Sequence, residues 1–220
     1  MENADIREKV VILGAGGHAK VVAECVDAEM YEIVGILDKD TKLVGTYVNG
    51  IPIIGSDEAP ECWLQKGITG CIIGIGHVGN YSLRKKLYEK YKNAGFHMIK
   101  AIHPGSLVSK NAKISDGTVV MPGTVINANA MIGNNVIINT GAVIEHDVVI
   151  HDGVHIAPGS IISGVSEIGE NTLIGARSVV IQMKKIGKNT IIGAGTVVIK
   201  DIPDSVVAVG NPARIVREDK

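Results

Sequence analysis

This sequence is poor in aromatic residues, in cysteine and in net charge. Aromatics make up 3% of its 220 residues, and the formal net charge is −1. A charge so close to zero gives no electrostatic hold on nucleic acid or on an anionic membrane, so we expect neither as a partner. The three cysteines form no C-x-x-C pair, which favours reduced thiols and a cytoplasmic protein. No apolar run reaches the roughly 18 residues of a membrane span, and the acidic start argues against a signal peptide; we expect no membrane insertion.

Glycine, Ile and Val are abundant instead, with 27 glycines in the chain and a second half dense in the two aliphatic residues. In steps of six from Ile102 to Val198, every one of seventeen positions is Ile or Val. Four residues after each of them the side chain is nearly always small, with Lys184 as the clear exception. The series is Ile102, Val108, Ile114, Val120, Ile126, Ile132, Ile138, Ile144, Ile150, Ile156, Ile162, Ile168, Ile174, Val180, Ile186, Ile192 and Val198.

A period of six fits neither an α-helix nor an alternating hairpin sheet. It fits a parallel β-helix, in which each hexad forms one short strand and a corner, and three hexads complete a coil. The aliphatic residue points inward and stacks on its counterpart 18 residues away, about 4.8 Å along the axis. The small residue lets the chain turn the corner. We predict such a β-helix, with a C-terminal tail, for residues 101–220.

The first hundred residues alternate strands with helices, which is typical of a small parallel α/β domain. We expect strands at 10–13, 32–37 and 71–75, and a helix that runs to about Glu29. Gly14-x-Gly16-x-x-Ala19 after the first strand, with Asp38 about twenty residues on, meets the dinucleotide fingerprint. About 100 residues hold only one mononucleotide half, so residues 1–100 form a Rossmann-like half domain that suits a nucleotide-linked ligand better than NAD. A tight turn without a ligand is the alternative.

The hexapeptide repeat and the ending Val209-Gly210-Asn211-Pro212-Ala213-Arg214 resemble the hexapeptide-repeat acyltransferases. That resemblance implies a left-handed β-helix and a homotrimer. An α/β domain that opens with Gly-x-Gly-Gly-His ahead of the repeat narrows the match. The chain resembles the sugar O/N-acyltransferases of the NeuD and PglD type, which acetylate nucleotide-linked 4-amino sugars, or in some members sialic acid, with acetyl-CoA as the co-substrate.

The resemblance also implies where the nucleotide-linked sugar binds. Gly16, Gly17 and His18 would lie at the nucleotide, Asp38 at its base or ribose, and Gly76 at the pocket wall. Lys39 belongs with these substrate-binding residues, at a position where the family commonly has a second acid.

Acyl transfer to an amine or hydroxyl needs a base, and histidine is the usual one because its pKa lies near neutrality. Beyond the entrance of the β-helix, where His103 lies, three histidines remain in the repeat: His146, His151 and His155. His146 has a carboxylate on each side, Glu145 and Asp147, either of which can orient its ring. The sequence alone does not choose between them. The resemblance implies His146 as the base, Asp147 as its partner, Asn139 as an assisting residue and His155 at the acetyl-CoA carbonyl.

The spacing of these residues leads to a hypothesis about assembly. Nine residues, half of a coil, separate His146 from His155, so within one chain the two lie on opposite sides of the prism. Asn139, sixteen residues before His155, lies about one coil below it on the same side. If Asn139 and His155 assist His146, they come from a neighbouring subunit, and the site lies at an interface.

Acetyl-CoA would then lie in the groove between two β-helices. Small residues there would let it approach the backbone: Gly164 by its spacing, Ala176 and Ala194 by the resemblance. The candidates for the CoA phosphates are Lys184, Lys185, Arg214 and Arg217.

Other functions compete with this one. A zinc-dependent carbonic anhydrase uses the same type of β-helix, and His146 and His151 have its five-residue spacing. The coils from Pro104 to Asn139 contain no third histidine, however, so we expect no metal. A non-catalytic trimer that binds nucleotide sugars is another alternative. Among acyltransferases we expect N-acetylation of a nucleotide-linked 4-amino sugar, with O-acetylation of sialic acid as the alternative.

Overall fold

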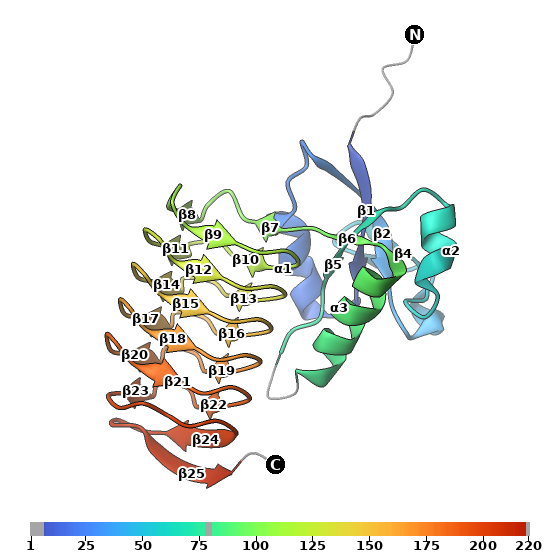
Figure 1. Cartoon of the computed structure of the whole chain (residues 1–220). Helices are drawn as coiled ribbons and strands as arrows, with labels where there is room; N and C mark the ends of the chain where they lie inside the picture. Colours follow the sequence, from blue (N-terminus) through green and yellow to red (C-terminus); the bar gives the residue numbers. More distant parts are fainter. Residues whose placement is uncertain (1–6, 78–80, 219–220) are drawn as a thin grey trace.

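The computed structural model describes residues 7–77 and 81–218. An α/β domain and a stack of β-helix coils lie side by side (Figure 1). The α/β elements end with β6 (His97–Met98), and the first strand of the β-helix, β7 (Ala101–Ile102), follows almost at once. Within the described ranges, no helix combines the length and the apolar composition that a bilayer span requires.

The α/β domain is built around one sheet with the strand order β3-β4-β2-β1-β5-β6, parallel except for the β3–β4 pair. The three predicted strands are present, but the first helix ends at Cys25 rather than near Glu29, and β3, β4 and α2 were not predicted. The elements before β6 are β1 (Glu8–Leu13), α1 (Gly17–Cys25), β2 (Tyr31–Leu37), the 3-10 helix η1 (Thr41–Leu43), β3 (Tyr47–Val48), β4 (Ile51–Gly55), α2 (Pro60–Gln65), β5 (Gly70–Ile73) and α3 (Ser82–Ala94).

Both faces of this sheet are covered, which explains the continuous apolar run of β1. Val10 and Ile12 belong to a cluster that also contains buried residues of α1 and of the β-helix. Val11 and Leu13 point to the other face and belong to a cluster with residues of α2 and α3. Because α1 packs on β7 and β10, the α/β domain and the β-helix share one apolar interface.

The β-helix has three sheets, one along each side of the prism, and their strands have two residues each except at the C-terminal end of the first sheet. The first sheet contains β7, β10 (Val119–Val120), β13 (Ile137–Ile138), β16 (His155–Ile156), β19 (Leu173–Ile174), β22 (Ile191–Ile192) and β24 (Val206–Val209). The second contains β8 (Leu107–Val108), β11 (Val125–Ile126), β14 (Val143–Ile144), β17 (Ile161–Ile162), β20 (Val179–Val180) and β23 (Val197–Val198). The third contains β9 (Lys113–Ile114), β12 (Met131–Ile132), β15 (Val149–Ile150), β18 (Glu167–Ile168) and β21 (Lys185–Ile186).

The predicted 18-residue stacking is confirmed by the strand register, in which Val120 pairs with Ile138 and Ile138 with Ile156. The repeat positions from Val120 to Val198 are at most 2% exposed and form one core. Fully burying such a side chain stabilises the fold by about 1.5–3 kcal/mol. The small corner residues are often Ser or Thr whose hydroxyl donates to a carbonyl of the next coil, as from Thr172 to Gly187 at 2.7 Å. At Lys184 the coil keeps its register, because the Lys184 carbonyl accepts from the Glu167 N–H at 2.9 Å.

The two ends of the repeat differ from its middle. Ile102 is 37% exposed, because β7 is the first strand of its sheet and has a partner on one side only. The prediction that every repeat position is buried is therefore wrong at this end. At the other end, β24 pairs with the antiparallel strand β25 (Arg214–Glu218), which was not predicted and covers the last coil.

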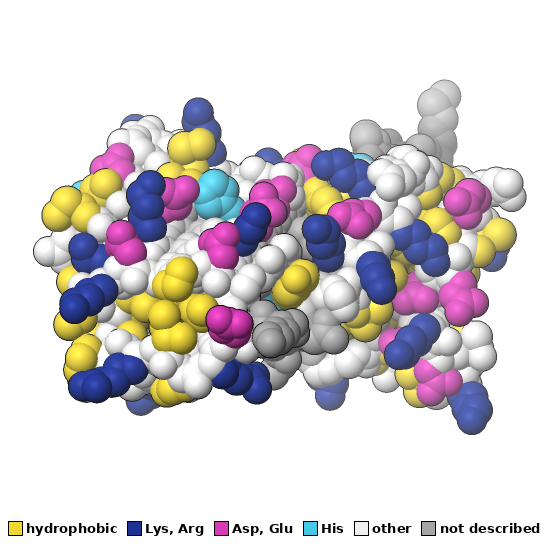
Figure 2. All heavy atoms as spheres, turned by 60° about the horizontal axis from the view of Figure 1, so that its bottom comes forward, with side chains coloured by type: hydrophobic (Ala, Val, Ile, Leu, Met, Phe, Trp, Pro, Cys, Tyr) yellow, Lys and Arg dark blue, Asp and Glu magenta, His cyan; other side chains and the backbone are white. Residues whose placement is uncertain are grey.

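On the face drawn in Figure 2, basic and acidic side chains are interspersed over both halves of the molecule. Neither sign dominates that face, in line with the formal net charge of −1.

Candidate active site

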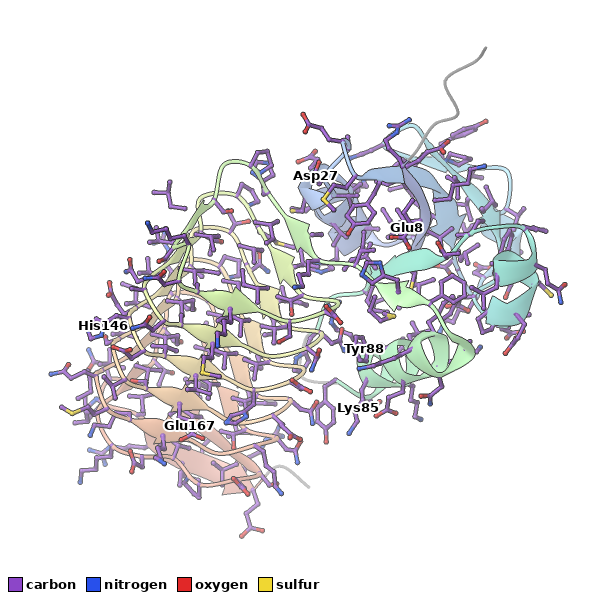
Figure 3. All side chains as sticks on the ribbon, turned by 45° about the horizontal axis from the view of Figure 1, so that its top comes forward. Glu8, Asp27, Lys85, Tyr88, His146 and Glu167 are labelled. Atoms are coloured by element: carbon purple, nitrogen blue, oxygen red, sulfur yellow. The ribbon has the colours of Figure 1, made fainter. Side chains whose placement is uncertain are left out.

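His146 lies at the corner between β14 and β15, on the side of the β-helix that points away from the α/β domain (Figure 3). Its Nδ1 lies 2.8 Å from Asp147 Oδ2, and the two side chains are 58% and 49% exposed. Asn129, one coil below, donates to the other Asp147 oxygen at 3.2 Å. The hydrogen bond from His146 and then that from Asn129 lower the pKa of the Asp147 carboxyl. An ionised Asp147 keeps the ring proton on Nδ1, which leaves the Nε2 lone pair of a neutral ring free to accept a proton.

The question of which carboxylate partners His146 is answered by the corner itself. Asp147 has a left-handed backbone conformation, with φ of 58°, and Asp is one of the few residues that adopt it readily. This turn brings the Asp147 carboxylate onto the His146 ring. Glu145 lines the adjoining pocket together with His146, Ser163, Gly164, Val165, Gln182 and Met183.

Gly164 lies one coil above His146, and the two are directly stacked, since Val165 N–H donates to the His146 carbonyl at 3.1 Å. A Cβ at position 164 would lie 2.7 Å from His146 Nε2. The basic nitrogen of His146 therefore occupies the space that a side chain at 164 would need.

His155 lies in β16 of the first sheet and faces the α/β domain. It is 7% exposed; its Nε2 lies 3.1 Å from Asn139 Nδ2, and its Nδ1 lies 2.7 Å from the His77 carbonyl oxygen. The pKa of His155 is lowered to about 4, mainly by burial. The hydrogen bond to His77 raises the pKa in part, and the charge of Arg84 lowers it further. The predicted proximity of Asn139 and His155 is confirmed. So is their separation from His146, which lies at another corner.

The glycine-rich loop after β1 gathers most of the predicted nucleotide-binding residues. Cβ atoms at Gly16 and Gly17 would meet nothing within 4 Å, so this backbone is open to a ligand. α1 begins at Gly17 without a side-chain cap, which leaves its first N–H groups available to an anion. Gly76 lies against His18, since its Cβ would be 3.7 Å from that ring. Burial, assisted by the charge of Arg84, lowers the pKa of His18 to about 3.

Asp38 follows β2 and holds this loop in place. Its Oδ2 accepts the Ala15 N–H at 2.7 Å, and its Oδ1 accepts the Asp40 N–H at 2.9 Å. Both oxygens thus have backbone donors. Lys39 lies beside it, exposed, on the loop after β2.

The candidates for the CoA site lie at two corners of the prism. Ala176 and Ala194 are stacked at the corner that follows the first sheet, as the 2.8 Å bond from Gly195 N–H to the Ala176 carbonyl shows; Asn139 lies at the same corner, lower in the stack. Gly164 shares the other corner with His146. Lys185 forms an ion pair with Glu167 at 3.0 Å, so it is already engaged. Lys184 is half-buried, and Arg214 lies exposed in β25.

Two residues of this region were missed from the sequence. The His77 carbonyl bonds to His155, and burial together with His155 and Arg84 lowers the pKa of the His77 ring to about 4. Arg84 is 2% exposed and donates to carbonyls of both the α/β domain and the β-helix. The available signal was the position of Arg84 on α3, in line with the buried residues Leu87, Tyr88 and Tyr91.

The third histidine of the repeat, His151, bonds through Nε2 to Glu167 at 2.9 Å (Glu167 is labelled in Figure 3). His146 and His151 therefore have separate carboxylate partners. Among the described residues, no group of three or more His, Cys, Asp or Glu side chains is arranged to hold a metal ion.

The comparisons with known proteins agree with this arrangement. The PglD N-terminal domain family matches residues 9–91, and the bacterial transferase hexapeptide family (six repeats) matches 111–146, 129–164 and 147–182. A crystal structure of a perosamine N-acetyltransferase mutant from Caulobacter crescentus, in complex with CoA and GDP-perosamine, is 40% identical with a TM-score of 0.88. The match covers 94% of this chain and 96% of that chain.

Two further relatives point the same way. The acetyltransferase domain of PglB from Neisseria gonorrhoeae FA1090, in complex with acetyl coenzyme A, is 36% identical with a TM-score of 0.86, over 96% of this chain and 100% of that chain. UDP-N-acetylbacillosamine N-acetyltransferase of Bacillus subtilis (strain 168) is 40% identical over 115 residues. That match spans 52% of this chain, and it covers 51% of the relative, about half of its length.

The left-handed β-helix of hexapeptide coils, matched by the bacterial transferase hexapeptide family, defines a hexapeptide-repeat acyltransferase. The PglD-type α/β domain ahead of it narrows the class, and the chain belongs to the family of hexapeptide-repeat sugar N-acetyltransferases.

Proposed function

We propose that this protein transfers the acetyl group of acetyl-CoA to the amino group of a nucleotide-linked 4-amino sugar. The observation that carries the proposal is the His146–Asp147 pair, whose free Nε2 faces a pocket beside Gly164. The relatives support the substrates: one structure contains CoA with GDP-perosamine, and another contains acetyl coenzyme A.

In the proposed reaction, the neutral amine of the sugar attacks the thioester carbonyl carbon. The new C–N bond forms while His146 Nε2 accepts a proton from the amine nitrogen. Asp147 stabilises the imidazolium that results, because it is the hydrogen-bonded carboxylate. The C–S bond then breaks, and the departing thiolate takes the proton from His146, which returns the base to its neutral state.

The acceptor is held by its nucleotide. Gly16, Gly17 and His18 form the open loop at the start of α1, with Gly76 as the opposite wall. The N–H groups there suit a diphosphate. Asp38 supports the loop through Ala15, and Lys39 lies next to it in the exposed segment where the base or ribose would bind.

We further propose that the active form is a homotrimer. The outward side chains of the second sheet are all apolar and at least partly exposed in the single chain: Leu107, Val125, Val143, Ile161, Val179 and Val197. This sheet lies between the corner of His146 and Gly164 and the corner of Asn139, Ala176 and Ala194. Packing of three such sheets around an axis buries them and brings one corner of each subunit to the other corner of its neighbour. Acetyl-CoA would lie in the groove between the two corners.

A thiol-release assay with acetyl-CoA tests the function. UDP-, GDP- and dTDP-linked 4-amino sugars are compared with sialic acid as acceptors, for the wild type, His146→Ala and His151→Ala. We expect turnover of a nucleotide-linked amino sugar, a loss of about 10²-fold or more in His146→Ala and no loss in His151→Ala. Turnover of sialic acid alone would assign O-acetylation instead. Nucleotide-sugar binding without CoA release, unchanged in His146→Ala, would indicate a non-catalytic binding protein.

A further inference from the structure

A buried contact between the α/β domain and the β-helix fixes the protonation of His155. Its Nδ1 lies 2.7 Å from the His77 carbonyl oxygen. A carbonyl oxygen only accepts hydrogen bonds, so the proton of this bond belongs to Nδ1. The rings of His77 and His155 also pack together, with centroids 6.0 Å apart.

The other ring nitrogen gives the same result independently. Asn139 Oδ1 accepts the Thr140 N–H at 2.8 Å, which fixes the orientation of the amide and points Nδ2 at His155. The Nδ2 group only donates, so His155 Nε2 accepts, at 3.1 Å. His155 is therefore the neutral Nδ1–H tautomer, and its Nε2 has no proton to give to a substrate.

The Asn139 amide, which bonds to His155, is the group on this side that can still donate a proton. Its Nδ2 carries two protons, of which one is bonded to His155. Asn139 is half-buried, whereas His155 is 7% exposed. The second Nδ2 proton is not used by His155, and in the proposed trimer it would be the donor available to an acyl oxygen in the groove.

Arg84 holds the two sides of this contact together. Its Nη1 donates to the carbonyls of Ile73 and Ile75, at 3.1 and 2.8 Å, and its Nε donates to the carbonyl of Asn135 at 3.4 Å. Ile75 lies two residues before His77. Asn135 lies in the coil that continues through β13 to Asn139.

The placement of this guanidinium is costly. Burial lowers the pKa of Arg84 to about 9. Its hydrogen bonds to Ile73, Ile75 and Asn135 all go to neutral backbone carbonyls rather than to a carboxylate. A buried charge without an ionic partner destabilises a fold. The planar fork of arginine reaches several carbonyls at once, which the single ammonium of lysine does not.

We infer that Arg84 is a positioning residue of the transferase: it clamps the loop of Ile75 and His77 onto the β-helix, so that the His77 carbonyl locks His155 in the Nδ1–H tautomer. His155 in that tautomer, together with the Thr140 N–H, holds the Asn139 amide toward the acetyl donor. This inference rests on the proposed function for its reaction, but the tautomer is a property of the protein alone.

The test combines kinetics with a spectroscopic readout on the 220-residue protein. Arg84→Lys and Arg84→Met are compared with Lys85→Met, a matched control on the same helix whose ammonium is exposed and 3.9 Å from Glu89. Ring ¹⁵N chemical shifts of ¹⁵N-histidine-labelled protein report the tautomer, and the signals of His155 are assigned by their loss in His155→Gln. Thermal unfolding shows which variants fold; Arg84→Lys carries the test if Arg84→Met does not.

In the wild type we expect His155 Nδ1 protonated and Nε2 unprotonated at neutral pH. In Arg84→Lys we expect a mixture of tautomers and a fall in kcat of about 10²-fold, with the KM for the nucleotide sugar changed much less. Lys85→Met should match the wild type in both measurements. An Nε2–H tautomer in the wild type would overturn the inference, as would an Arg84→Lys enzyme with wild-type kcat or with reduced kcat and an unchanged tautomer. If the wild type acetylates no acceptor while the tautomer still depends on Arg84, the proposed function fails and the clamp stands.

Discussion

Replacement of Gly164 by alanine tests the site most directly, because the new methyl group would strike the proposed base. The Cβ would lie 2.7 Å from Nε2 and 2.8 Å from Cε1 of His146, whereas ordinary contact begins at 3.4 Å. The ring therefore has to retreat by about 0.7 Å. A retreat of that size, if directed along the 2.8 Å bond to Asp147, would lengthen it to about 3.5 Å, where a hydrogen bond is weak.

The backbone itself accepts a side chain at this corner. The equivalent positions one coil below and one coil above are His146 and Gln182, and the latter corner is linked to Gly164 by a 3.0 Å bond from Met183 N–H to the Gly164 carbonyl. His146 is 58% exposed, so its ring can move without disturbing the core. We expect Gly164→Ala to melt within a few degrees of the wild type while kcat falls by about 10²-fold, as for the loss of a base.

A double-mutant cycle separates this effect from a general disturbance of the pocket. Thiol release is measured for Gly164→Ala, His146→Ala and the double variant, with Gln182→Ala as the control. If the alanine acts through His146, its effect in the His146→Ala background is less than about 2-fold. A full additional loss in that background, or wild-type kcat in Gly164→Ala alone, would refute the reasoning.

Three further predictions concern the partner of the base, the assembly and the response to pH. Asp147→Asn should lower kcat about 10- to 10²-fold, because the amide cannot stabilise the imidazolium. Glu145→Gln should keep kcat within about 2-fold of the wild type. Equal effects of the two substitutions in the thiol-release assay would contradict Asp147 as the partner of His146. Ile161→Asp, on the second sheet, should give a monomer in size-exclusion chromatography with light scattering, and this monomer should be inactive. Met131→Asp, on the third sheet and 51% exposed, should remain an active trimer. A fully active monomer would disprove the shared site. The free energy of unfolding should fall as the pH drops from about 6.5 toward 4, because an unfolded histidine binds a proton there and His155, whose pKa is lowered to about 4, stays neutral in the folded state. The slope is at most about 1.4 kcal/mol per pH unit for one such group, and denaturant titrations of His155→Gln should show a shallower fall; a slope equal to that of the wild type would count against the buried neutral ring.

The β-helix could be predicted from the sequence because it repeats one local rule. Each hexad needs an inward aliphatic residue and a small corner residue, so the period of six and the register of 18 follow from the residues alone. The same arithmetic places Asn139 beneath His155, and the structure confirms it at 3.1 Å. Prediction fails where the repeat has no next coil, at the exposed Ile102 and at the antiparallel β25.

The choice between Glu145 and Asp147 could not be made in this way. Alternation of side chains holds along a strand but not at a corner, where a residue in the left-handed conformation interrupts it. Asp147 is such a residue, with φ of 58°. Its orientation depends on a backbone angle that the sequence does not state.

The contact between the α/β domain and the β-helix could not be predicted from the periodic pattern either. Seventy-eight residues separate His77 from His155, and 51 separate Arg84 from Asn135. These pairs meet only because α1 packs on β7 and β10 and so sets the α/β domain against the first sheet. A charged residue on the apolar side of α3 was the single local sign of this interface.

The loop after β5 connects the two halves of the proposed reaction. Gly76 forms a wall beside His18, where the nucleotide would bind, and the next residue, His77, supplies the carbonyl that holds His155. The acceptor and the acetyl donor would thus be positioned by neighbouring peptide groups of one loop. Since Arg84 bonds to this loop at Ile75 and to the coil at Asn135, a shift of the α/β domain would disturb both the wall of the nucleotide site and the bond between the His77 carbonyl and His155. An added nucleotide-binding domain therefore contributes more than affinity: under the proposed function, it is also part of the support for the acetyl-donor site.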